Sequence, residues 1–197
     1  NVLEIKKIKD DSFIAKFFNL FSTLPSIVFK NHNQLLRLEI ENFRSLKKEI
    51  IEFHSGINVI IGHNNVGKTN VIKALSLILN SNRTKRLDIN DINQNFSEEE
   101  IKKEAPKVTI SIYFNESEKE EEFSEDLVLA STWLTKLEKP YEAKLTYEFF
   151  LPEREQEDYQ NKLMEINTTN DDWKEKFWKM LEHNFLRKYI YKIYVGN

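Results

Sequence analysis

Hydrophobic and charged residues alternate at every second position in several short stretches of the chain. The first is residues 35–43, where three apolar side chains fall on one side of a strand and three charged ones on the other. Residues 48–53 follow after a short turn, so the two stretches are expected to pair as a hairpin. Residues 57–61 form an apolar run behind Gly56, which predicts a strand buried on both faces.

The period changes to that of a helix over residues 68–79. The polar residues of this stretch recur on one stripe, while apolar residues cover most of the remaining surface. The stripe consists of Asn70, Lys73, Ser76 and Asn80. The pattern therefore predicts a helix that is buried over most of its circumference.

The second half of the chain adds strands and helices in alternation. Strands are predicted over residues 108–114, 144–150 and 188–195, and helices over residues 125–138, 153–166 and after Asp172, where Glu175 completes a capping box. Residues 81–107 are expected to be a polar loop, with the glutamates at 98–100 facing solvent. This order predicts an α/β fold with a mixed sheet, against which the helix of residues 68–79 packs.

The first 33 residues differ from the rest. Residues 13–29 carry phenylalanine and leucine at helical spacing, and polar residues follow Pro25. We expect residues 1–33 to be a helical extension docked on the core or on a partner, and residues 34–197 to be the main domain. A membrane-surface helix or a signal segment is the alternative for residues 13–29. No segment approaches the ~20 apolar residues that span a bilayer, so no membrane partner is expected.

Composition and charge narrow the chemistry. The chain of 197 residues has no cysteine, which excludes disulfides, thiolate metal sites and a cysteine nucleophile, and fits a cytoplasmic protein. Its four histidines are too scattered for a metal motif. A net charge of −3 gives no global field that would attract nucleic acid, so any DNA contact needs a local basic patch. The candidates for such a patch are Arg83, Lys85, Arg86, Lys174, Lys176, Arg187 and Lys188.

Two of the four glycines lie five residues apart in one loop. The loop reads Gly62-His63-Asn64-Asn65-Val66-Gly67-Lys68-Thr69, which fits the pattern GxxxxGK[ST]. Its backbone N–H groups can converge on phosphate oxygens, because glycine leaves no side chain in the way. Lys68 can reach the β- and γ-phosphates of ATP, and the hydroxyl of Thr69 can bind Mg²⁺. The strand before the loop and the helix after it supply the expected context, so the loop predicts an ATP and Mg²⁺ site with Lys68 and Thr69 as catalytic residues.

The flanks of the loop resemble the N-terminal ATPase segment of the SMC/RecF/OLD group, where OLD means overcoming lysogenisation defect. The resemblance covers residues 36–79 and rests on the N-F-R-S element of residues 42–45, on the "GIN" turn and on Asn70. It implies an ABC-type ATPase that acts on DNA, with Asn64, Gly67 and Asn70 at the nucleotide. It also implies that Arg44 and Ser45 approach the phosphates or the base. Because Asn65 replaces a glycine common in SMC and RecF proteins, the loop is most similar to OLD-type nucleases and phage-defence ATPases.

Other parts of an ABC site are missing from the sequence. We find no glutamine loop, no signature sequence, no strand ending in Asp-Glu and no switch histidine; the nearest strand ends in Asn115-Glu116. We therefore expect an incomplete ATPase lobe that forms a homodimer or higher oligomer through its head and meets DNA through a longer protein. A nucleotide-binding module without turnover is the alternative, as is a RecF- or SMC-like repair ATPase. An unrelated kinase or GTPase lacks support, because no NKxD motif and no lid-like arginine cluster is present.

Overall fold

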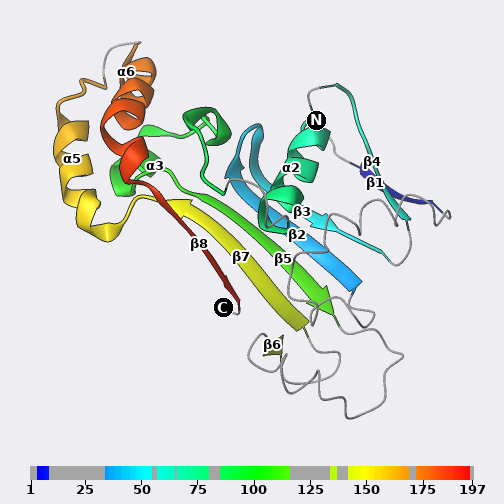
Figure 1. Ribbon diagram of the computed structural model, residues 1–197. Helices are drawn as coiled ribbons and strands as arrows, with labels where there is room; N and C mark the ends of the chain where they lie inside the picture. The colour runs from blue at the N-terminus through cyan, green and yellow to red at the C-terminus, as the bar shows by residue number, and fades with distance from the viewer. Residues whose placement is uncertain are drawn as a thin grey trace.

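The computed structural model describes residues 4–8, 34–54, 57–64, 66–79, 85–115, 134–136, 142–168 and 172–195. These residues form an antiparallel sheet, a separate two-stranded ribbon, one helix across a face of the sheet and further helices at one of its ends (Figure 1). The predicted helix over residues 13–29 and most of the predicted helix over residues 125–138 lie outside the described residues. None of the described helices is long and apolar enough to cross a membrane.

The large sheet has the strand order β3-β2-β5-β7-β6, and β8 also pairs with β7. Its strands are β2 (Gln34–Phe43), β3 (Leu46–Glu52), β5 (Val108–Asn115), β6 (Leu134–Lys136), β7 (Glu142–Phe150) and β8 (Ile190–Val195). Every described strand pair is antiparallel. The predicted hairpin is confirmed, with Phe43 opposite Leu46 beside its turn. The strands predicted over residues 108–114, 144–150 and 188–195 are confirmed as well.

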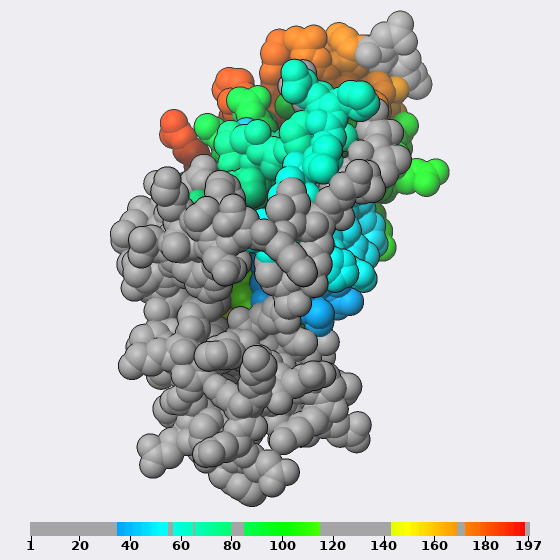
Figure 2. Space-filling model, turned by 90° about the vertical axis from the view of Figure 1, so that its right-hand side faces the viewer, coloured from blue at the N-terminus to red at the C-terminus, as the bar shows by residue number. Residues whose placement is uncertain are grey.

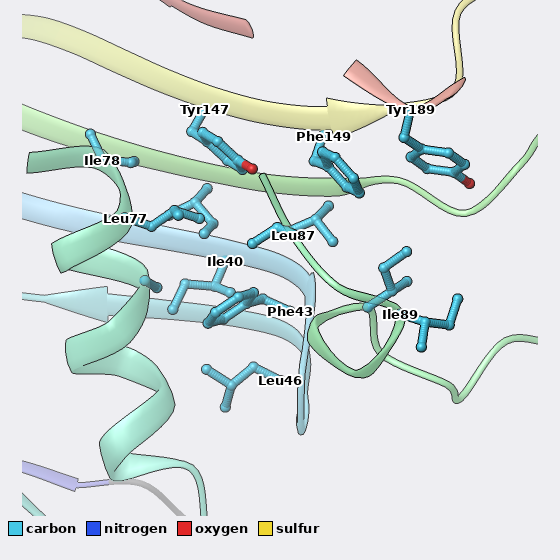
Figure 3. Close-up of a cluster of buried hydrophobic side chains, with 14 of the residues drawn as sticks. Ile40, Phe43, Leu46, Leu77, Ile78, Leu87, Ile89, Tyr147, Phe149 and Tyr189 are labelled. Carbon is cyan, nitrogen blue, oxygen red and sulfur yellow. The ribbon is translucent and has the colours of Figure 1, made fainter. Parts of the chain in front are cut away.

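The core lies between one face of this sheet and α2 (Lys68–Leu79). Alternation along β2 and β5 buries one row of apolar side chains completely, among them Leu38, Ile40 and Ile110. Val71 and Ala74 of α2 are buried in the same core, and Figure 3 shows the neighbouring cluster around Phe43, Leu77 and Tyr147. Each fully buried aliphatic side chain contributes about 1.5–3 kcal/mol. The prediction of a largely buried helix is confirmed, although Ile72 remains 45% exposed.

Aromatic side chains join the helices at the end of the sheet. These helices are α3 (Glu98–Lys103), α5 (Gln156–Met164) and α6 (Trp173–Met180), and α6 continues through further helical turns to Lys188. The buried ring of Tyr159 packs edge-on against Phe185 at 5.7 Å, and its hydroxyl donates to the carbonyl of Ile101 in α3 at 2.8 Å. Burial also raises the pKa of Tyr159. The helices predicted over residues 153–166 and after Asp172 are thus confirmed.

Three details of the predicted elements are wrong. The capping box at Asp172 does not form, because the carboxylate of Asp172 pairs with Lys176 at 2.8 Å and its backbone leaves the extended conformation that a capping residue needs. Residues 81–107 are not a continuous loop, since they contain a 3₁₀ turn at Ile89–Asp91 and α3. The predicted helix over residues 125–138 is contradicted at Leu134–Lys136, which pairs with β7 as β6.

The strand before the glycine loop forms as predicted, but it is less buried than predicted. It forms as β4 (Ile57–Ile61), but it pairs with β1 (Glu4–Ile8) in a two-stranded antiparallel ribbon outside the large sheet. Ile57 is buried, whereas Ile61 is 42% exposed. The apolar run was therefore correctly predicted to be a strand and wrongly predicted to be buried on both faces, because the large sheet does not flank it.

Candidate nucleotide-binding site

The loop of residues 62–69, called the phosphate loop below, joins β4 to α2 and curls around the ammonium group of Lys68. Lys68 Nζ donates to the carbonyl oxygens of Gly62 at 2.5 Å and of His63 at 2.7 Å. The amide of Val66 donates to the same His63 carbonyl at 3.4 Å. Asn65 lies outside the described residues. The region from β4 to α2 reaches the surface in Figure 2, where it is coloured cyan to teal.

Position 67 requires a glycine, both for its backbone conformation and because neighbouring atoms leave no room for a side chain. Its φ is 110°, in a region that residues with a side chain rarely adopt. A Cβ at this position would lie 2.6 Å from Leu46 Cδ2 and 3.2 Å from Ser45 Oγ. Its carbonyl accepts from the amides of Asn70 at 2.9 Å and Val71 at 3.0 Å, which begins α2. The glycine therefore lets the loop pass close under the turn between β2 and β3 while the helix starts.

The turn between β2 and β3 contacts the first turn of α2, next to the phosphate loop. Asn70 Nδ2 donates to Ser45 Oγ at 2.9 Å, although 25 residues separate the two along the chain. Thr69 and Asn64 are exposed, so their side chains are open to a ligand. The structure thus brings Ser45, Gly67 and Asn70 together with Lys68.

Arg44 points elsewhere. Its guanidinium forms an ion pair with Asp91, with Nη2 and Oδ1 2.6 Å apart. Both side chains line a pocket of about 250 Å³ beside α2, together with Phe43, Lys73, Leu77, Arg86 and Leu87. Arg44 and Asn42 both have positive φ values, 53° and 58°, so this turn is tightly bent.

Two residues of this region were missed by the sequence interpretation. Asp91 pairs with Arg44, and Asn93 Nδ2 donates to the carbonyl of Arg44 at 2.5 Å. Asp88 and Asp91 form a capping box around the 3₁₀ turn, and that spacing is the only local signal in the sequence. Their contact with the N-F-R-S element depends on the tertiary fold.

The phosphate loop fits a Mg-nucleotide by its donors and its shape. Gly67 packs against Leu46 and Ser45 with no room for a side chain, and Lys68 donates to the backbone carbonyls of Gly62 and His63. The hydroxyl of Thr69 suits Mg²⁺, which prefers oxygen ligands. Within the described part of the chain, no group of three or more His, Asp or Glu residues could hold a metal ion on its own.

A family model for the AAA ATPase domain matches residues 34–195. The chain belongs to this family. The α/β fold of a P-loop NTPase predicted from the sequence is confirmed by this match. ATP is the nucleotide that the AAA ATPase family implies, typically with Mg²⁺.

Known DNA-repair proteins are similar to parts of this AAA ATPase domain. A DNA double-strand break repair Rad50 ATPase from Sulfurisphaera tokodaii is 39% identical over 77 residues, which is 39% of this chain and 8% of that protein. A DNA replication and repair protein RecF from Streptococcus suis is 43% identical over 44 residues, 22% of this chain and 12% of that protein. These matches support the resemblance to the SMC/RecF group of ABC-type ATPases. The matched stretches span about a tenth of the length of these relatives.

One solved structure is also similar, in a study described as "Structural biochemistry of ATP-driven dimerization and DNA stimulated activation of SMC ATPases". The TM-score is 0.35 at 20% identity, with 78% of this chain and 96% of that chain covered.

The candidate DNA-binding residues are mostly engaged within the fold. Lys188 pairs with Glu155 at 2.9 Å and Asp158 at 2.8 Å, and Lys176 pairs with Asp172. Arg86 donates to the carbonyls of Leu186 at 2.7 Å and Tyr189 at 3.1 Å, and Lys85 donates to carbonyls of α2. Lys174 lies over the ring of Trp173 at 5.6 Å, and Arg83 is outside the described residues. Most of the candidate cations in the described residues therefore serve contacts within the fold.

Proposed function

We propose that this AAA ATPase domain binds Mg-ATP at the phosphate loop and is the Walker A lobe of a DNA-associated ABC-type ATPase. The observation that supports this most directly is the ammonium group of Lys68 inside the loop, held by the carbonyls of Gly62 and His63. A lysine in that position is a point charge that can transfer from carbonyl oxygens to the β- and γ-phosphates. Asn64, Asn65 and Val66 are proposed to supply further backbone donors to a bound nucleotide, and Thr69 is proposed to bind Mg²⁺.

Bound Mg²⁺ would neutralise phosphate charge, and the chain's own residues would orient the nucleotide. The helix α2 begins at Lys68 beside the loop, and its positive N-terminal end favours the negative charge of phosphates. Ser45 and Arg44 are proposed to complete the site from the turn between β2 and β3. Ser45 is already tied to the helix through Asn70.

In the whole protein, ATP binding and hydrolysis are proposed to gate a DNA-processing activity. Heads of this type close as a homodimer or higher oligomer around ATP, so that a partner completes the contacts to the γ-phosphate. The replacement of a loop glycine by Asn65 favours an OLD-like anti-phage nuclease over a repair ATPase like RecF or SMC. Most of the candidate DNA-binding residues are engaged within the fold, so we expect DNA to be bound by another part of that protein.

A nucleotide-binding module without turnover is the second candidate. Within the described residues no group of three or more His, Asp or Glu residues could hold a metal ion, and β5 ends at Asn115 without an aspartate. In this case ATP would act as a structural link or a sensor.

The deciding experiment measures Mg-ATP binding and phosphate release by this chain and by Lys68→Ala. We expect binding without release from the unaltered chain and no binding from the variant. Release that disappears in Lys68→Ala would show that a hydrolytic site is complete in this chain, against the second candidate. Equal ATP affinity in both proteins would refute the assignment of the phosphate loop.

A further inference from the structure

The turn of residues 42–45 is held from two sides. On one side Ser45 contacts Asn70 at the start of α2. On the other side lies the segment of residues 88–93, which follows α2 in the chain. The amide of Arg44 donates to the carbonyl of Asp91 at 2.9 Å, and the amide of Asn93 donates to the carbonyl of Asn42 at 2.8 Å. The segment therefore fixes the backbone of a turn whose other end touches the phosphate loop.

The ion pair between Arg44 and Asp91 adds to this attachment but is incomplete. The side chain of Arg44 is 32% exposed and that of Asp91 is 18% exposed. One carboxylate oxygen of Asp91 faces Arg44, while the other accepts from the amide of Asp88 at 3.1 Å. Arg44 Nε is buried and has no hydrogen-bond partner within the described part of the chain. The strongest arginine–carboxylate geometry uses two parallel hydrogen bonds, so this pair is weaker than it could be.

The charges around the ion pair also favour a move of Arg44 from Asp91 to another anionic partner. The pocket that contains it is lined by three cationic side chains, Arg44, Lys73 and Arg86, and by one carboxylate, that of Asp91. Arg86 is engaged with backbone carbonyls, and Lys73 has no ion pair among the described residues. The pocket therefore carries excess positive charge one to two turns along α2 from the phosphate loop. A polyphosphate in that loop would offer Arg44 a second, more highly charged partner.

We infer that Asp91 is a positioning residue that holds Arg44 away from the nucleotide and must release it when Mg-ATP binds. This inference rests on the proposed function, since it needs ATP at the phosphate loop. Arg44 then exchanges one carboxylate oxygen for phosphate oxygens, which can also satisfy its unpaired Nε. Asp91 thereby lowers the affinity of the free protein for ATP and makes Arg44 available only when the site is filled.

The test compares Mg-ATP affinity, measured by calorimetry, among four forms of this chain: unaltered, Asp91→Asn, Arg44→Gln and the double variant. Asparagine keeps an oxygen for the amide of Asp88 but loses the charge that binds Arg44. We expect Asp91→Asn to bind Mg-ATP about fivefold more tightly, the scale of a partly exposed ion pair. The gain should vanish when Arg44→Gln is also present. Asp158→Asn is the matched control, because it breaks a 2.8 Å pair with Lys188 elsewhere and should leave affinity unchanged.

A second readout needs no nucleotide. In urea unfolding of the four forms, the shifts in midpoint caused by Asp91→Asn and Arg44→Gln should be non-additive, because the two residues share one interaction. Additive shifts, or an Asp91→Asn affinity equal to or weaker than that of the unaltered chain, would overturn the inference and leave the proposed function standing. Absence of ATP binding by the unaltered chain would instead overturn the proposed function and, with it, the inference.

Discussion

Two lysines at the two ends of α2 make similar contacts in opposite electrostatic surroundings. Lys68 donates to the carbonyls of Gly62 and His63 before the helix, and Lys85 donates to those of Leu77 and Ile78 at its end. The last carbonyls of a helix lack partners and carry partial negative charge, so Lys85 stabilises the fold there. The N-terminal end is partly positive and disfavours a cation. Lys68 therefore occupies a position that folding does not favour and that phosphate binding does.

The largest expected effect comes from removing the lysine at the N-terminal end. Lys68→Ala should weaken Mg-ATP binding roughly 100-fold or more, because truncating one partner of a desolvated charge pair typically costs about 2–5 kcal/mol. The free energy of unfolding should change by less than about 1 kcal/mol, since the loss of two hydrogen bonds is offset by removing a cation from the positive end of the helix. Calorimetry and urea unfolding check the two parts. A clear loss of stability would show that Lys68 has a structural role like that of Lys85.

The next effect concerns the backbone beside Lys68. Gly67→Ala places a Cβ at a φ of 110° and 2.6 Å from Leu46 Cδ2. We expect a loss of about 2–3 kcal/mol in the free energy of unfolding, from backbone strain and from displacement of the turn above it. ATP binding should fall as well, because the loop can no longer close under Ser45. Leu46→Ala alone also lowers stability, because Leu46 is buried, so the double variant should lose less than the sum of the two single losses.

The phosphate loop could be predicted from the sequence, whereas the contacts around Arg44 could not. The spacing of Gly62, Gly67 and Lys68 predicted the loop and its chemistry because each requirement is local. The ion pair of Arg44 with Asp91 was not predictable, since it depends on how the segment after α2 folds back onto the hairpin. The helix α3 had a local signal, the capping box of Ser97 and Glu100, but three successive glutamates suggested a solvated run instead.

Lys85, at the C-terminal end of α2, should show the opposite pattern to Lys68, with an effect on stability and none on ATP binding. Lys85→Ala should lower the free energy of unfolding by about 1–2 kcal/mol, since two carbonyls of α2 lose a charged donor. Mg-ATP affinity should not change by more than the experimental error, because Lys85 lies at the far end of the helix. The same two measurements apply as for Lys68→Ala, so each variant serves as the control for the other. Equal effects of both variants on binding would contradict the distinction between the two helix ends.

The smallest effect concerns an ion pair that joins α3 to β3. Lys47 Nζ lies 2.8 Å from Glu100 Oε1, and this contact, followed by the hydrogen bond from the backbone of Ser97, lowers the pKa of Glu100. A lowered pKa stabilises the folded state at neutral pH, and this share is lost as the pH falls below about 4.5, the ordinary pKa of a glutamate. Because the carboxylate is 45% exposed, Glu100→Gln should cost only about 0.5 kcal/mol at pH 7 and nothing in strong acid. Glu99→Gln, at a glutamate that has no ion pair among the described residues, is the control in urea unfolding at both pH values. Equal losses from the two variants would show that the ion pair between Lys47 and Glu100 adds no stability. The surface ion pair would then differ from the contacts of Lys85, which are expected to stabilise the fold.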